Sequence, residues 1–280
     1  MSGARVITLE RIATLDVAAA SGLVLIDGEL VVVADDELAL SRYGTDGQPR
    51  GRQPLFAGSL PDEPAARKRA KPDLESLVAL PGGRLLALGS GSAAGRDRAA
   101  LVDGDTVTEI DLEPLYSALR GQFDRLNVEG ACAIGGELVL LTRRTGRRGR
   151  NALVRLDLDT SLAALEARRL EGDLIAAVQE VELGALGGAP LGFTDATPWR
   201  DGLLFSAAAE VTDDPVDDGA CVGCAIGLLV DGAVRWREPV DPCVKLEGIA
   251  AEGRRLFAVA DADDRARLAP LFTATLPVAV

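Results

Sequence analysis

Acidic and hydroxyl side chains recur along this chain at the start of short apolar segments. The five residues are Ser21, Glu75, Glu129, Asp195 and Glu247. After each of them a glycine-containing turn follows within about six to eight positions, and a second apolar segment returns. Four of the five carry a carboxylate. If the fold brings them together, they would form a site for a hard cation or for general acid–base chemistry.

The intervals between these residues predict a repeated structural unit. They range from 52 to 66 residues, and the second repeat shows four apolar segments joined by tight turns over residues 76–112. Four short strands in about fifty residues are typical of one propeller blade. The chain has 280 residues. We therefore predict an all-β fold, a five-bladed β-propeller that forms a single domain over residues 1–280.

The last repeat lacks an outer strand, whereas an unassigned strand lies near Arg5 to Ile12. A strand from one end of the chain that completes the blade at the other end would hide the last open sheet edge. A pair of β-sandwiches is the alternative, but it does not account for five equivalent openings and a spare strand. Outside the blades we predict a short helix over 111–123, a charged loop over 61–72 and some helix within 174–191.

Composition excludes several classes of function. The chain has no histidine, so Ser-His-Asp and Cys-His catalytic centres and zinc sites with an imidazole ligand are excluded. Its formal net charge of −13 disfavours binding to nucleic acid. Charged residues interrupt every long apolar stretch, and no signal peptide is recognisable. We expect a cytoplasmic monomer with no nucleic-acid partner and no membrane association.

The first strand of each blade lines the channel of a propeller, so the five recurring residues should meet at one channel mouth. Carboxylates crowded there cannot all remain ionised without compensation. A bound Ca²⁺ ion is one means, since it takes six to eight oxygen ligands at about 2.3–2.6 Å. Its predicted ligands are Ser21, Glu75, Glu129, Asp195 and Glu247. Basic neighbours such as Lys71 and Lys245 are the other means, and simple solvation of the mouth is a third interpretation.

Arginine-rich loops are predicted to surround the same mouth, because the loop after the second strand of each blade returns to it. Guanidinium groups bind phosphate and carboxylate groups through paired hydrogen bonds, which predicts a small anionic substrate or ligand. The predicted substrate-binding residues are Arg96, Arg143, Arg147, Asn151, Lys71 and Lys245. A solvated charged loop is the alternative. The corresponding loop of the fourth repeat, 210–219, is acidic and predicts a lid or a second cation site.

The cysteines do not predict a disulfide framework. Cys221 and Cys224 have the CxxC spacing of redox and zinc motifs, but no second CxxC accompanies them. They open an apolar strand, so we interpret them, like Cys132, as small buried apolar residues.

Four short motifs add a resemblance to known families. KPDLESL, NVEGACAI, GFTDATPW and KLEGIAA resemble the blade openings of a bacterial propeller family described as phytase-like or esterase-like, which has no established function. More distantly, Lys245-Leu246-Glu247-Gly248 is similar to a motif of the calcium-activated nucleotidases (apyrases), which are five-bladed. That resemblance implies Ser21, Glu75, Glu129 and Glu247 as calcium ligands.

Two functions remain open from the sequence. The first is a Ca²⁺-dependent hydrolase that acts on a phosphoester, a phosphoanhydride or another small anionic ester at the channel mouth. In it, Glu75 or Glu129 would orient a water molecule or accept its proton. The second is a non-catalytic propeller that binds a metabolite, sugar or peptide at the same mouth.

Overall fold

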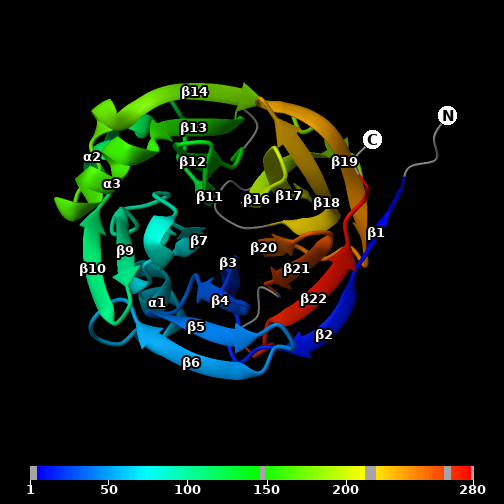
Figure 1. Ribbon diagram of the computed structural model, residues 1–280, viewed down its shortest axis with the longest axis horizontal. Helices are drawn as coiled ribbons and strands as arrows, with labels where there is room; N and C mark the ends of the chain where they lie inside the picture. The colour runs from blue at the N-terminus through cyan, green and yellow to red at the C-terminus, as the bar shows by residue number, and fades with distance from the viewer. Residues whose placement is uncertain (1–4, 146–148, 212–218, 262–265, 279–280) are drawn as a thin grey trace.

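The structure, a computed structural model, describes residues 5–145, 149–211, 219–261 and 266–278. They form five sheets arranged as blades around a central axis (Figure 1). The first strand of each blade lies nearest the axis, and the last lies on the outer rim. The predicted five-bladed β-propeller is confirmed.

Blades one to three each contain four consecutive strands. Blade one contains β3 (Ala20–Ile26), β4 (Glu29–Ala34), β5 (Ala39–Gly44) and β6 (Pro49–Pro54). Blade two contains β7 (Leu74–Ala79), β8 (Leu85–Gly89), β9 (Arg98–Asp103) and β10 (Thr106–Asp111). Blade three contains β11 (Val128–Ile134), β12 (Glu137–Thr142), β13 (Asn151–Asp157) and β14 (Ile175–Val181).

Blades four and five depart from this plan. Blade four contains β15 (Ala185–Leu186) and the longer strands β16 (Ala189–Trp199), β17 (Gly202–Val211), β18 (Ala220–Val230) and β19 (Ala233–Asp241). Blade five contains β20 (Leu246–Glu252), β21 (Arg255–Ala260), β22 (Pro270–Thr275) and the N-terminal β2 (Glu10–Thr14).

The N-terminal segment closes the ring, as the spare strand predicts. β2 pairs antiparallel with β22 and completes blade five. Just before it, β1 (Ile7–Thr8) pairs in parallel with β19, the outer strand of blade four. The predicted closing strand near Arg5–Ile12 is therefore shared between two blades. It leaves neither of their outer strands as an open edge along the paired residues.

Helices occupy the connections, and two of the sequence predictions for them need correction. The helices are α1 (Pro64–Ala70), α2 (Glu113–Arg120) and α3 (Leu158–Glu166), with 3₁₀ turns at Pro81–Gly83 and Gly172–Leu174. The helix predicted over 111–123 is confirmed as α2. The predicted loop over 61–72 contains α1, because Pro64 starts it and the Glu63 carboxylate caps two of its amides. The segment 174–191 forms β14, β15 and the start of β16 rather than further helix, because it pairs with β13 and β17.

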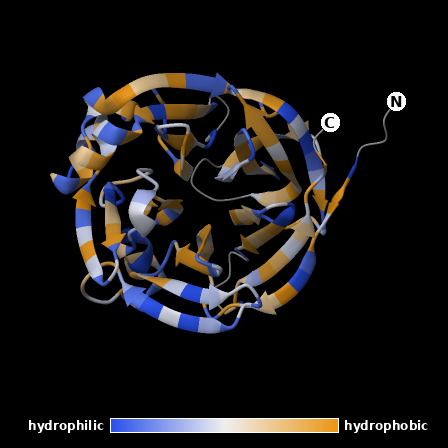
Figure 2. Cartoon of the chain, viewed as in Figure 1, coloured by the Kyte–Doolittle hydropathy of each residue, from blue (hydrophilic) through white to orange (hydrophobic). Residues whose placement is uncertain are grey.

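Apolar side chains fill the spaces between neighbouring blades. Five clusters of buried residues occur in the described chain, one at each interface of the ring. The strands near the axis are mainly hydrophobic, whereas β6 on the rim is mainly hydrophilic and exposed (Figure 2). Among the described helices, none has the length and apolar character needed to cross a bilayer. The hydrophobic core is therefore divided among the five interfaces between neighbouring blades.

Candidate functional site

Each innermost strand has a β-bulge, near the strand start in four blades and in the middle of the longer β16, and the residue left out of the pairing is polar in every blade. The bulged residues are Ser21, Glu75, Glu129, Thr194 and Glu247. A bulge inserts one unpaired residue and changes the direction of its side chain. Four of the five residues singled out from the sequence therefore occupy equivalent positions. In blade four that position belongs to Thr194, one residue before Asp195.

Asp195 has an inter-blade role instead of the predicted place in the ring. In the strand register it corresponds to Gly130 and Gly248, where the chain approaches the next blade closely. Its Oδ2 accepts a hydrogen bond of 2.7 Å from the amide of Ile249 in blade five. The side chain is buried, and this burial raises the pKa of Asp195 well above its usual range. Asp195 thus links blades four and five.

The two hydroxyl residues of the ring are also used for local contacts. The Ser21 hydroxyl donates to the Leu74 carbonyl in β7, which links blade one to blade two. The Thr194 hydroxyl donates to the Ser206 hydroxyl in the neighbouring strand at 2.8 Å. The remaining bulged residues, all glutamates, take part in two groups of charges.

The first group, here the Asp73 cluster, consists of Asp35, Asp73 and Glu75 with the cations Lys71 and Arg96. One carboxylate oxygen from each acid lies within 4.8 Å of the others. Lys71 Nζ forms ion pairs with Asp35 and, at 2.9 Å, with Asp73 Oδ1. Arg96 Nη1 contacts Asp73 Oδ2 at 2.7 Å. Asp73 therefore has two cationic partners, whereas Glu75 has no side-chain hydrogen bond or ion pair with any residue that the structure describes.

Helix α1 positions the lysine of this cluster. Lys71 directly follows the helix, and its backbone amide donates to the Arg67 carbonyl at 2.8 Å. The Arg67 side chain binds both the carboxylate and the carbonyl of Asp36, which follows β4. These contacts fix the end of the helix against the loop that carries Asp35. Lys71 is thereby held between the strand ends of blades one and two.

Glu75 is the most perturbed carboxylate at the mouth. Close packing of protein around it is the main cause that raises its pKa well above the usual range, and the negative charges of Asp73, Glu129 and Asp35 raise it further. Its surface remains partly exposed. Burial alone would lower the pKa of Lys71, but the charges of Asp35, Asp73 and Glu75 together raise it. Glu75 therefore keeps its proton to a higher pH than an ordinary glutamate, while the ammonium of Lys71 stays charged.

The second group, here the Glu210 cluster, consists of Glu129, Glu210 and Glu247 with the cations Arg143 and Lys245. Arg143 contacts Glu129 Oε2 at 3.4 Å and also pairs with Glu210. Lys245 Nζ lies 3.3 Å from Glu210 Oε1 and 2.8 Å from Glu247 Oε1. All five side chains are at most 9% exposed. Each cation thus bridges two acids in a buried chain that crosses three blades.

Four of the six predicted substrate-binding residues form ion pairs with carboxylates of the two clusters. These four are Lys71, Arg96, Arg143 and Lys245. Asn151 differs from the prediction: it is buried, its amide donates to the Leu191 carbonyl at 2.9 Å, and its carbonyl oxygen accepts from the amides of Arg144 and Phe193. It joins blade three to blade four. Arg147 lies outside the described residues, as do positions 212–218 of the predicted acidic lid.

Sequence reasoning missed Asp35 and Asp73, and it placed Glu210 only in the acidic lid. Asp35 directly follows the second strand of blade one, and Asp73 lies two residues before Glu75. Both residues lie at the channel mouth, because the first strand of a blade starts there and the loop after the second strand returns there. The same reasoning predicted the position of the arginine-rich loops. That topological signal could have identified Asp35 and Asp73: Asp261 directly follows the second strand of blade five and so holds the position of Asp35, whereas the position of Asp73 has no acidic counterpart in the other blades.

The cysteines differ from the sequence prediction in one respect. Cys132 and Cys224 are buried, and burial raises the pKa of the Cys132 thiol. Cys221 is only half-buried, and a hydrogen bond with the Cys224 thiol lowers the pKa of Cys221 to about 6. Cys243, remote in sequence, lies beside them. Cys221 is therefore not a simple core residue.

A hollow of about 510 Å³ lies away from the charged mouth, beside β1, β19 and β22. Its lining includes Arg5, Glu238 and Arg254. None of the carboxylates of the Asp73 or Glu210 cluster lines it, so we place the candidate site at the channel mouth on chemical grounds.

Comparison with known proteins supports the fold and leaves the activity open. Residues 16–276 match a family of unknown function (DUF6929). The chain belongs to this family. No curated protein matches the sequence. The family description carries no activity, so the phytase-like and apyrase resemblances of the DUF6929 chain stay predictions.

Solved structures with similar architecture are distant in sequence. The glutaminyl cyclase of Myxococcus xanthus is 15% identical with a TM-score of 0.52, and the match covers 97% of this chain and 98% of that one. A glycosyl hydrolase from Bacteroides ovatus is 12% identical with a TM-score of 0.55, covering 94% and 85% of the two chains. At such identities the likeness shows the propeller fold alone.

Proposed function

We propose that this chain is a hydrolase whose active site lies at the channel mouth, between the Asp73 cluster and the Glu210 cluster, and that it binds a divalent cation, Ca²⁺ in the first instance. The observation that carries the proposal is the closeness of three ligand oxygens, from Asp35, Asp73 and Glu75, within 4.8 Å of one another. Oxygens at that separation can contact one Ca²⁺ ion, whose ligands lie at about 2.3–2.6 Å.

The residues present fit a hard cation in most respects. The donor set consists of oxygen, which Ca²⁺ prefers to nitrogen or sulfur. Glu75 makes no hydrogen bond or ion pair with a described residue, although it interacts electrostatically with the charge of Lys71. Burial and then repulsion from neighbouring carboxylates raise its pKa, and a bound cation would relieve the repulsion. The ammonium of Lys71, which contacts Asp35 and Asp73, would have to share these carboxylates with the ion. Ser21, Glu129 and Glu247, which the sequence predicted as ligands, are not in the proposed ligand set. The proposed ligands Asp35, Asp73 and Glu75 come from blades one and two.

Glu129 is the candidate base. Its carboxylate accepts a hydrogen bond from the Asn127 amide and contacts Arg143 at 3.4 Å. These contacts stabilise its charged form and fix its orientation, so it can orient a water molecule or accept its proton. A bound divalent cation would supply Lewis-acid polarisation of a substrate oxygen and a more acidic water. Glu75 is electrostatically coupled to Glu129, so the two carboxylates act on the same region of the mouth.

The proposed substrates are phosphoesters, phosphoanhydrides and other small anionic esters. Lys71, Arg96, Arg143 and Lys245 are all engaged by carboxylates, and together the two clusters hold more acids than cations. Without a divalent cation, the mouth would therefore repel an anion. Binding of the substrate should require the cation, which makes calcium dependence a stringent test.

A second candidate is glycoside hydrolysis without a metal. Glu75 has a raised pKa, and Glu129 is held beside Arg143, so the pair offers one proton donor and one charged carboxylate. Contrasting environments of this kind separate the acid and the base in glycosidases. The glycosyl hydrolase from Bacteroides ovatus has a similar fold, which is compatible with this candidate.

The test is a screen of phosphomonoesters, nucleoside diphosphates, phytate, p-nitrophenyl esters and p-nitrophenyl glycosides, each with Ca²⁺ and with EDTA. We expect turnover of an anionic ester that requires Ca²⁺ and falls at least about tenfold in Glu75→Gln and in Glu129→Gln. Glu252→Gln, an exposed acid at a distant turn, is the matched control and should be unchanged.

The other outcomes are equally informative. Turnover of a glycoside in EDTA would favour the second candidate. No turnover across the panel, together with binding of a sugar, peptide or metabolite that Glu129→Gln abolishes, would reject both hydrolases and favour a non-catalytic binding propeller.

A further inference from the structure

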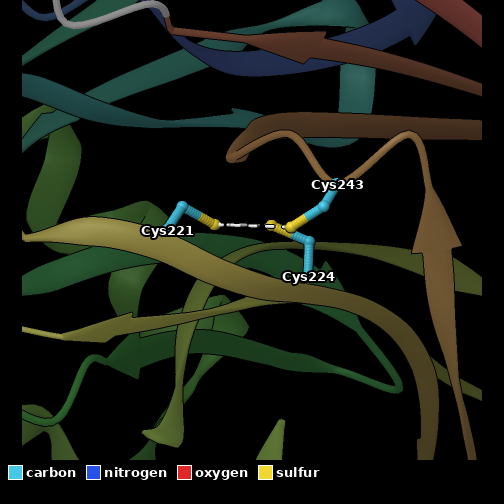
Figure 3. A group of neighbouring side chains, drawn as sticks. All are labelled: Cys221, Cys224 and Cys243. Atoms are coloured by element: carbon cyan, nitrogen blue, oxygen red, sulfur yellow. Dashed lines mark hydrogen bonds between the residues drawn. The ribbon is translucent and has the colours of Figure 1, made fainter. Parts of the chain in front are cut away.

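Three cysteines that are separated in sequence converge at one end of blade four (Figure 3). Cys221 Sγ lies 3.3 Å from Cys224 Sγ and 4.0 Å from Cys243 Sγ. All three sulfurs lie within 4.8 Å of one another. Cys224 is buried, Cys221 is half-buried and Cys243 is exposed, so solvent can reach one side of the group. The chemistry proposed for the carboxylates does not use these thiols.

A bulge in β18 brings the first two cysteines together. In a regular strand, residues three positions apart point to opposite faces. Ala209 pairs with Gly223 and Glu210 pairs with Cys221, which leaves Val222 as an extra residue. This extra residue returns Cys221 and Cys224 to the same side. A Cβ atom at Gly223 would lie 2.6 Å from the Leu186 side chain, so the backbone approaches β15 closely here.

The third thiol comes from the connection between blades four and five. Cys243 lies between β19 and β20, two residues before Lys245 of the Glu210 cluster. Both flanking elements are paired into their blades, which holds the connection in place beside β18. The paired strands thus hold the three thiols close together before any metal ion binds.

The number and spacing of the sulfurs favour a metal ion over a disulfide. Three thiolates bound to one Zn²⁺ at about 2.3 Å lie roughly 3.8–4.0 Å apart. The Cys221–Cys243 distance of 4.0 Å matches that value, and the Cys221–Cys224 distance of 3.3 Å is shorter, so Cys224 and Cys221 would move slightly apart around an ion. A disulfide would join two of the sulfurs and leave the third beside it without a role. Thiolate ligands select Zn²⁺ and Cu⁺ over hard cations such as Ca²⁺.

We propose that Cys221, Cys224 and Cys243 bind one thiophilic metal ion, Zn²⁺ or Cu⁺, through three thiolates. The exposed side of the group leaves room for water or another ligand at the ion. This site is separate from the proposed carboxylate site and differs from it in ligand type, so the two proposals succeed or fail independently.

The full-length chain, reduced and freed of metal, is titrated with Zn²⁺ against a chromophoric zinc indicator, and with Cu⁺ against a chromophoric copper(I) chelator. We expect one ion per chain and, with Co²⁺ as a probe, a thiolate-to-metal charge-transfer band. Cys243→Ser should weaken binding at least tenfold and lose that band without unfolding, because Cys243 is exposed. Cys132→Ala, at a buried cysteine outside the group, should bind as the original chain does.

Binding of Zn²⁺ or of Cu⁺ at this stoichiometry supports the proposal and identifies the ion. Two results would overturn it. One is the absence of stoichiometric binding while thiol titration shows all four cysteines reduced. The other is binding that Cys243→Ser and Cys221→Ser leave unchanged. A Cys221–Cys224 disulfide in chains that bind no metal after reduction would show a redox pair instead.

Discussion

The Asp73 cluster and the Glu210 cluster each contain three carboxylates and two cations, yet their charges are arranged differently. In the Glu210 cluster, Arg143 and Lys245 each bridge two acids, and Glu210 forms an ion pair with both. In the Asp73 cluster both cations converge on Asp73, which leaves Glu75 with no ion-pair partner among the described residues. With the same number of acids and cations, ion pairs join all members of the Glu210 cluster, whereas Glu75 lies outside the ion pairs of the Asp73 cluster. The Glu210 cluster is not fully hydrogen-bonded, since Glu210 Oε1 and Glu247 Oε2 have no hydrogen-bond partner among the described residues.

The difference indicates a division of roles at the mouth. A buried network in which each cation bridges two acids resists the loss of any member, because a remaining charge would be left unpaired in a low-dielectric surrounding. Glu75, which makes no ion pair among the described residues, is available to a proton, a cation or a substrate, and burial together with neighbouring carboxylates raises its pKa. Burial also raises the pKa of the paired Glu247, so the missing ion pair, and not the pKa, distinguishes Glu75. We interpret Glu210, Glu247, Arg143 and Lys245 as the support that orients Glu129, and the Asp73 cluster as the side that faces it across the proposed active site.

The largest expected effect comes from breaking the ion pairs of the Glu210 cluster. Lys245→Met leaves Glu210 and Glu247 buried without their shared cation, and should lower the free energy of unfolding by about 3–5 kcal/mol. Urea denaturation measures this. The matched control is Arg169→Met, which removes an exposed ion pair with Glu171 and should change stability by less than about 1 kcal/mol. Similar small losses in both variants would contradict the supporting role.

Neutralising one acid in each cluster should give opposite signs. In calcium-free buffer at neutral pH, Glu75→Gln removes the free-energy cost of burying this carboxyl beside Asp73, Glu129 and Asp35, whether the cost is a buried charge or an uptake of a proton on folding. We expect it to raise the melting temperature by about 2–4 °C, the shift that 1 kcal/mol produces in a chain of this size. Glu210→Gln removes the negative charge that forms ion pairs with both Arg143 and Lys245 and should lower the melting temperature. Calorimetry of both variants tests this, and shifts of the same sign would contradict it.

The pH dependence of stability should separate the two clusters further. The folded state binds the Glu75 proton more tightly than the unfolded state, because its pKa is raised. The free energy of unfolding should therefore fall as pH rises from the ordinary pKa of glutamate through the raised value. Glu75→Gln should flatten this fall, although Asp195 and Glu247, whose pKa values are also raised, keep part of it. Denaturation at a series of pH values would show an unchanged slope if Glu75 were not protonated.

The smallest expected effect concerns the hydroxyl position of the ring. Ser21→Ala removes one hydrogen bond to the Leu74 carbonyl, next to Glu75, and should cost about 0.5–1.5 kcal/mol. Urea denaturation measures the loss. The calcium response should persist, because Ser21 is engaged with blade two and is not in the proposed ligand set. Loss of the calcium response in Ser21→Ala would instead favour the predicted ring of ligands that includes Ser21.

Much of this fold could be predicted from the sequence because each blade buries its strands in the same way. The repeat of a polar residue, a strand, a glycine turn and a second strand follows from that local requirement, so it predicted five blades and the closing N-terminal strand. It also predicted that Glu75, Glu129 and Glu247 occupy equivalent positions, because a bulge at each strand start is a local feature of about the same sequence in every blade.

Only the tertiary structure decided which of these residues are partnered. Thr194 and Asp195 are adjacent in sequence, and the pairing register with β17 determines that Thr194 is bulged and Asp195 bonds to blade five. The bulge at Val222 likewise sets two cysteines on one face, which the CxxC spacing does not reveal.

The ion pairs depend on distances between blades. Arg143 reaches Glu210 across 67 positions of sequence, and Lys71 reaches Asp35 across 36. Local sequence carries the pattern that forms strands and bulges. It does not carry the rotation of one blade against the next, which decides whether a carboxylate meets a cation, a backbone amide or solvent.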